Sequence, residues 1–145
     1  MENADRRAYP EGSMSLVDRV RALLEGEPAV RLAYLFGSAA RGEAGVESDV
    51  DLAVLLEPAG RILEIAERLE GGTGRTVDLV DLRRAPPLLL REVLRDGLVL
   101  ACRDPLERAE FEARALAEYL DTQHLRDVQR QYLRERAEAR HGAPR

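Results

Sequence analysis

Apolar and polar positions along this chain form short, dense apolar runs separated by longer amphipathic stretches. The dense runs have four to seven residues and are bounded by glycine, proline or charged residues, which is typical of buried strands. The strands that we expect are Val30–Phe36, Val50–Leu56, Thr76–Leu82 and Leu98–Ala101.

Between these runs, apolar residues recur at helical spacing. Ser15, with Asp18 three residues later, is a typical helix start. We expect helices over 16–24, 62–69 and 88–94 and a helical turn over 39–41, with Gly71, Gly72 and Gly74 ending the second helix. Strands that alternate with helices predict an α/β fold for roughly the first 102 residues.

The remainder, residues 103–145, has a helical pattern that begins at an aspartate cap, Asp104, followed by Pro105. One helix of about 35 residues is long for a globular domain, so a break near Asp121 and Thr122 is expected. We expect this extension to pack on the first domain or on a partner. Its expected buried positions are Phe111, Leu116, Tyr119, Leu120, Leu125, Val128, Tyr132 and Leu133.

Composition narrows the classes of function. The net charge of −5 argues against a general binder of nucleic-acid backbones, and no apolar run is long enough to span a membrane. One cysteine, Cys102, and two histidines exclude an internal disulfide and a zinc site built on several cysteines or histidines. We expect Cys102 to be an ordinary buried residue and the compartment to be a reducing cytoplasm. All 22 basic residues are arginine, which excludes lysine-dependent chemistry.

The segment GSAARGEAGVESDVD, residues 37–51, carries the candidate chemistry. Asp49 and Asp51 lie two positions apart at a strand start, so they share one face about 7 Å apart and repel each other unless a cation lies between them. Oxygen ligands favour Mg²⁺ or Mn²⁺. Gly37 and Ser38 precede a helical turn whose N–H groups can hold a phosphate. Together these features indicate a site for a nucleoside triphosphate.

A third carboxylate comes from the strand TVDLVDL. Asp78 has apolar neighbours on both sides and therefore points away from them, so it can join Asp49 and Asp51 if the two strands are adjacent. Asp81 is the alternative, at the strand end and on the opposite face.

The segment GSAARGEAGVESDVDLAVLL resembles the motif of the minimal nucleotidyltransferases of the DNA polymerase beta superfamily: Gly-Ser, ten residues, then Asp-x-Asp. RTVDLVDL is similar to the strand that supplies the third carboxylate in that family, and DPLERAEFEARALAEYLDTQHLRDVQRQYL is similar to the helical tail of MntA-type antitoxins. The resemblance implies a small mixed sheet with flanking helices (α+β), a catalytic domain over 1–102 and a helical extension over 103–145.

For this chain, the resemblance implies transfer of AMP from ATP to a hydroxyl. Asp49, Asp51 and Asp78 would hold two Mg²⁺ ions, Gly37 and Ser38 the β- and γ-phosphates, and Arg41 is a candidate for contact with the triphosphate. MntA-type proteins adenylylate a tyrosine of a HEPN-domain ribonuclease toxin and so act as antitoxins. The expected partner is therefore a HEPN toxin, with which the chain could form an oligomer, and no direct contact to nucleic acid or membrane is expected.

Three alternatives remain open at this point. The chain could modify a small molecule such as an aminoglycoside, although little chain is left for a domain that holds this acceptor. It could neutralise a partner by contact alone, with an idle nucleotide site. It could also extend a nucleic acid, against which the acidic charge argues.

Overall fold

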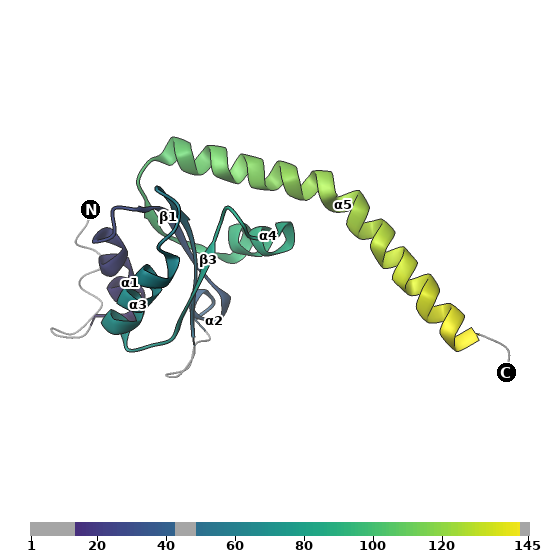
Figure 1. Cartoon of the computed structure of the whole chain (residues 1–145), viewed down its shortest axis with the longest axis horizontal. Coiled ribbons are helices and arrows are strands. Elements are labelled where there is room, and N and C mark those ends of the chain that lie inside the picture. Colours follow the sequence, from purple (N-terminus) through teal and green to yellow (C-terminus); the bar gives the residue numbers. More distant parts are fainter. Residues whose placement is uncertain (1–13, 43–48, 143–145) are drawn as a thin grey trace.

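The computed structural model describes residues 14–42 and 49–142. A four-stranded mixed sheet with strand order β3-β2-β1-β4 forms its centre (Figure 1). The elements follow the chain as α1 (Leu16–Glu25), β1 (Val30–Phe36), α2 (Gly37–Ala40), β2 (Val50–Leu56), α3 (Ile62–Thr73), β3 (Val77–Asp81), α4 (Pro87–Asp96), β4 (Leu98–Cys102) and α5 (Pro105–Gly142). The expected mixed α/β fold with flanking helices is confirmed.

Strand pairing brings the carboxyl end of β1 beside the amino ends of β2 and β3. β1 pairs antiparallel with both β2 and β4, whereas β2 and β3 are parallel. Because β1 runs against its neighbours, the turn that leaves β1 at Gly37 lies at the edge where β2 and β3 begin.

Two apolar layers cover the sheet, one on each face. Helices α1 and α3 cover one face through side chains such as Leu24 and Leu69, which pack on alternate strand residues including Leu52. Helix α4 and the first part of α5 cover the other face, where Val93 and Phe111 belong to the second core. Figure 1 shows α1 and α3 together on the side of the sheet opposite α4.

The expected helix starts are confirmed, and one helix end differs. Ser15 Oγ accepts a hydrogen bond from Asp18 N at 3.1 Å, and Asp104 Oδ1 accepts one from Leu106 N at 3.0 Å. Helix α3 continues through Gly71 and Gly72 and ends at Gly74, which has a φ of +69°. Packing explains the difference, because Gly72 lies so close to Leu23 of α1 that a Cβ there would overlap the leucine side chain.

The expected break in the C-terminal helix is wrong, because α5 is one helix of 38 residues. Figure 1 shows that it bends about half-way along. In this region Thr122 Oγ1 donates to the carbonyls of Glu118 and Tyr119, at 3.0 and 3.1 Å. A threonine that bonds back to the preceding turn commonly bends a helix without interrupting it.

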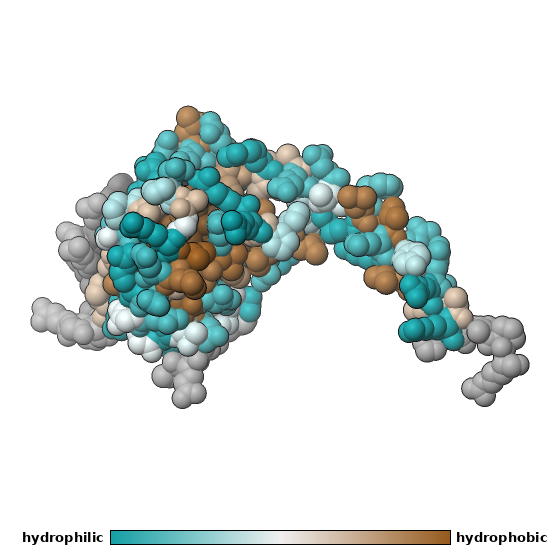
Figure 2. Space-filling view, viewed as in Figure 1, coloured by the Kyte–Doolittle hydropathy of each residue, from teal (hydrophilic) through white to brown (hydrophobic). Residues whose placement is uncertain are grey.

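Most positions expected to be buried in α5 are exposed. Phe111 is buried, together with Ala115, which the sequence did not single out, and Tyr119 is half-buried. The incorrect positions, at least half exposed, are Leu116, Leu120, Leu125, Val128, Tyr132 and Leu133. The physical reason is that α5 runs past the edge of the sheet, and its outer half projects with apolar side chains on its surface (Figures 1 and 2).

Cys102 is also exposed rather than buried, since it is the last residue of the edge strand β4. Within the described part of the chain, no helix combines the length and the apolar character required to cross a bilayer.

Candidate active site

Two carboxylates meet where the parallel strands β2 and β3 begin. Asp51 and Asp78 are paired in register. Neighbouring strands lie about 4.8 Å apart, and side chains at paired positions share a face. Ala53 and Leu82, further along the same rows of side chains, belong to the core beneath α4 and α5. The two carboxylates therefore lie on the α4 side of the sheet, at its edge.

Asp81 is placed differently. It pairs with Val54 on the opposite row of β3, and its Oδ1 accepts a hydrogen bond from Arg83 N at 2.9 Å. It therefore stabilises the turn after β3, and the structure brings Asp78 rather than Asp81 beside Asp51.

The electrostatic surroundings of Asp51 show that negative charge is concentrated here. Partial burial raises the pKa of the Asp51 carboxyl, and the charges of Asp78, Asp49 and Glu92 raise it further, whereas Arg41 opposes them. A raised carboxyl pKa means that the ionised form is disfavoured. A cation bound between these groups would remove that penalty.

The donor set has the chemistry of a Mg²⁺ site. Asp49 is exposed and lies directly before β2, two residues from Asp51. Carboxylate oxygens are the ligands that Mg²⁺ prefers, and no softer ligand accompanies them. Among residues 14–42 and 49–142, no three acidic, histidine or cysteine side chains lie close enough together to hold a metal ion by themselves. The fit of the aspartates to Mg²⁺ therefore rests on their ligand type and on their shared edge of the sheet.

The turn after β1 places the backbone of Gly37 directly beside the Asp51 side chain. The φ of Gly37 is +72°, and a Cβ added to this residue would overlap Asp51 Oδ2 and lie 3.2 Å from Asp51 Cγ. Only glycine adopts this backbone conformation freely and leaves room for the carboxylate. Ser38 follows in α2, and Arg41 is the exposed residue that ends this short helix. Residues 43–48, which include Glu43, Glu47 and Ser48, lie outside the described residues.

Comparison with known proteins identifies the family. Residues 18–106 match the family described as polymerase beta, nucleotidyltransferase. The chain belongs to this family. A protein adenylyltransferase, MntA, of Shewanella oneidensis is 38% identical to this nucleotidyltransferase over 82 residues, which are 54% of this chain and 58% of that relative. The matched stretch thus spans less than two thirds of the relative's length.

Solved structures extend the similarity over more of the chain. A crystal structure of a toxin–antitoxin with AMP-PNP is 29% identical, with a TM-score of 0.71, and covers 81% of this chain and 97% of its own. A structure of a tri-AMPylated Shewanella oneidensis HEPN toxin in complex with an MNT antitoxin is 26% identical, with a TM-score of 0.65, and covers 81% and 95%. The resemblance stated from the sequence motif is confirmed by these matches.

Sequence reasoning missed Glu92, whose charge acts on Asp51. Glu92 lies in α4, 41 positions after Asp51, and no sequence motif of this family links the two positions. The packing of α4 across β1 brings them together, through residues such as Val93. Only knowledge of where α4 crosses the sheet could have revealed it.

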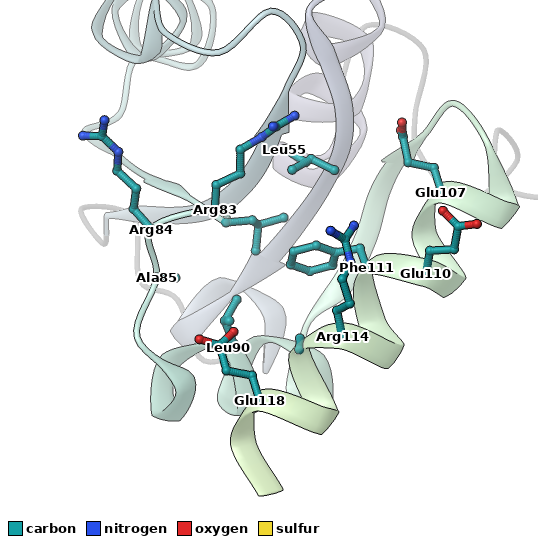
Figure 3. Close-up of a pocket in the computed structure, with 12 residues that line it drawn as sticks. Leu55, Arg83, Arg84, Ala85, Leu90, Glu107, Glu110, Phe111, Arg114 and Glu118 are labelled. Atoms are coloured by element: carbon teal, nitrogen blue, oxygen red, sulfur yellow. The ribbon is translucent and has the colours of Figure 1, made fainter. Parts of the chain in front are cut away.

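A groove lies at the other end of the strands (Figure 3). This groove has a volume of about 530 Å³ and an apolar floor that includes Leu55, Leu82 and Phe111. Figure 3 shows Arg114 reaching up beside Phe111, from α5. Leu55 is four residues beyond Asp51 along β2, or about 13 Å at the usual strand rise, so the groove is separate from the carboxylate edge.

Proposed function

We propose that this nucleotidyltransferase moves AMP from ATP to a tyrosine hydroxyl of a cognate HEPN toxin, in a Mg²⁺-dependent reaction, and so acts as an antitoxin. One observation carries the proposal: Asp51 and Asp78 are in register, with the turn at Gly37 fitted against Asp51. The solved relatives include toxin–antitoxin complexes, one with AMP-PNP and one with an AMPylated HEPN toxin.

In this proposal each site residue has a distinct role. Asp49, Asp51 and Asp78 would hold two Mg²⁺ ions. Gly37 and Ser38 would bind the β- and γ-phosphates, and Arg41 would offset the charge of the triphosphate. When bound, Mg²⁺ would supply the positive charge that lets three carboxylates and a triphosphate share one site.

The acceptor oxygen attacks the α-phosphorus as the bond to the β-phosphate oxygen breaks, releasing pyrophosphate. Asp78 accepts the proton of the attacking hydroxyl. Its position beside Asp51 and its exposure to solvent support this role, since an incoming acceptor can reach it.

A protein acceptor suits the shape and charge of the chain. The net charge is −5, and the outer half of α5 projects from the sheet with exposed apolar side chains. We propose a catalytic domain over residues 1–102 and an extension over 103–145, whose first part packs on the sheet and whose outer part contacts the toxin. We expect the transfer of AMP to take place in the cytoplasm.

The test is intact-mass spectrometry of the HEPN protein co-expressed with this chain or with single variants. We expect a gain of one or more AMP units with the unmodified chain and with Asp81→Asn. We expect none with Asp51→Asn or Asp78→Asn, because each removes the negative charge of a proposed metal ligand. Asp81→Asn is the matched control, since it makes the same chemical change three residues away, on the other row of β3.

Two other results would contradict the proposed function. A stable complex without any mass gain would contradict transfer and favour neutralisation by contact alone. Release of pyrophosphate with an aminoglycoside, in the absence of the HEPN protein, would favour a small-molecule acceptor.

A further inference from the structure

Asp96, at the C-terminal end of α4, contacts one arginine side chain and is influenced electrostatically by two others. Arg95 donates to Asp96 Oδ2 from Nε at 3.1 Å and from Nη2 at 2.9 Å. The pKa of Asp96 is lowered, first by the hydrogen bonds from Arg95 and its charge and then by the charges of Arg41 and Arg91. Three guanidinium groups thus lie within electrostatic reach of one carboxylate.

The end of α4 lies beside the turn that leaves β1. Gly97 ends α4, and a Cβ there would be 3.4 Å from the carbonyl oxygen of Leu35, two residues before Gly37. Leu98 then pairs with Leu35. The arginine cluster is therefore adjacent to the Gly37–Arg41 turn, and Arg41 acts electrostatically on both Asp96 and Asp51.

The Arg91 side chain also contacts α5, where it stacks on the ring of Tyr119. Its guanidinium carbon lies 5.2 Å from the ring centre of Tyr119, and that of Arg126 lies 4.1 Å from the same ring. Arg126 also donates to the Tyr119 carbonyl at 2.8 Å. Stacking on a half-buried ring restricts a long side chain, so Arg91 is partly ordered before any ligand arrives.

We propose that Arg91 and Arg95 of α4, together with Arg41, complete the subsite of Gly37 and Ser38 for the β- and γ-phosphates, and that Asp96 is the counter-ion that orders these arginines until a nucleotide binds. The inference rests on the proposed nucleotide site and deepens it, since it names residues outside the Gly-Ser and Asp-x-Asp motif.

The physical argument is one of charge balance. A triphosphate approaching Asp49, Asp51 and Asp78 meets negative charge, so the phosphates that leave as pyrophosphate need cations on their outer side. A guanidinium group can donate two hydrogen bonds to one phosphate, and Arg91 and Arg95 lie one turn apart on the same helix. The helix dipole destabilises a negative charge at the C-terminal end of α4, where Asp96 lies. The neighbouring arginines, rather than the helix terminus, therefore stabilise the Asp96 carboxylate.

The test measures ligand binding to the purified full chain by calorimetry, in the presence of Mg²⁺, with pyrophosphate, ATP and AMP as probes. Arg91→Gln and Arg95→Gln should each weaken pyrophosphate and ATP about tenfold, the loss expected for one charge-assisted contact, and leave AMP unchanged. Arg84→Gln is the matched control, since Arg84 is an exposed arginine just before the other end of α4.

Asp96→Asn separates ligand binding from a structural role. It removes a negative charge that competes with phosphate, so pyrophosphate should bind several-fold more tightly. If it weakens pyrophosphate as the arginine variants do, or if those variants bind all three probes as the unmodified chain does, the inference is wrong. Arginine-dependent binding without any transfer to the HEPN protein would instead uphold this subsite and contradict the proposed function.

Discussion

At the scale of single residues, the site depends on how closely a backbone turn can approach a carboxylate. Gly37 and Asp51 come from different strands, yet a single added carbon at Gly37 would overlap the Asp51 side chain. The motif read from sequence placed both residues in the site. The structure adds why position 37 must be glycine: a positive φ and a lack of space act together.

A comparison of Gly37→Ala with Gly74→Ala separates the effect of backbone strain from that of steric overlap with Asp51. Both glycines have φ near +70°, but nothing lies within 4 Å of a Cβ added to Gly74. Each variant should lose about 1–2 kcal/mol of unfolding free energy from backbone strain. Only Gly37→Ala should abolish transfer, because it displaces Asp51. Urea unfolding and an AMP-transfer assay measure the two quantities, and equal activity of the variants would contradict the explanation.

At the scale of elements, a short polar network ties α5 to the sheet. Tyr34 of β1 donates from its hydroxyl to Glu112 Oε1 at 2.6 Å, and Arg108 Nε donates to the same oxygen at 2.8 Å. Tyr34 lies within the strand expected over Val30–Phe36, and its ring is buried. The partner of its hydroxyl is 78 residues away and could not be identified from spacing.

This network predicts a pH dependence. Partial burial raises the pKa of Glu112, but the hydrogen bonds from Tyr34 and Arg108 and the charge of Arg108 outweigh burial and leave the pKa below its usual value. A lowered carboxyl pKa contributes stability above the pKa of the unfolded chain, and this contribution is lost as the pH falls through the folded-state pKa. The window therefore lies below about pH 5.

Glu112→Gln provides the comparison, because it keeps an acceptor for Tyr34 and removes the charge. At pH 7 it should lower the free energy of unfolding by about 1 kcal/mol, a modest value because 35% of the Glu112 side chain is exposed. The difference from the unmodified chain should shrink towards pH 3 in urea unfolding. A difference that is constant with pH would contradict the assignment.

At the scale of the whole molecule, the first part of α5 packs on the sheet and its outer part is exposed to solvent. Its first part supplies Phe111 and Ala115 to the core, whereas the described side chains from residue 127 onward are all exposed (Figure 2). The amphipathic pattern is similar in both parts. What differs is whether the sheet extends beneath the helix.

Removal of residues 127–145 should therefore leave the melting temperature within about 2 °C of the full chain, since the described side chains in this segment, up to residue 140, are exposed. Phe111→Ala, in the packed part of the same helix, should lower the unfolding free energy by about 3 kcal/mol. Thermal unfolding followed by circular dichroism compares the two. A truncated chain as unstable as Phe111→Ala would show that the outer helix packs on the domain.

The sequence by itself determined the strands, the helix caps and the motif of Gly37, Ser38, Asp49 and Asp51, because strand alternation, capping and turn chemistry act over a few residues. Tertiary structure decided the rest. It placed Asp78 beside Asp51, brought Glu92 within electrostatic reach of Asp51, and left Leu125 exposed. Arg103 is a further example: its side chain donates to the carbonyls of Leu24, Glu25, Glu27 and Val30. Such contacts depend on which elements pack together, and local periodicity carries no information about that.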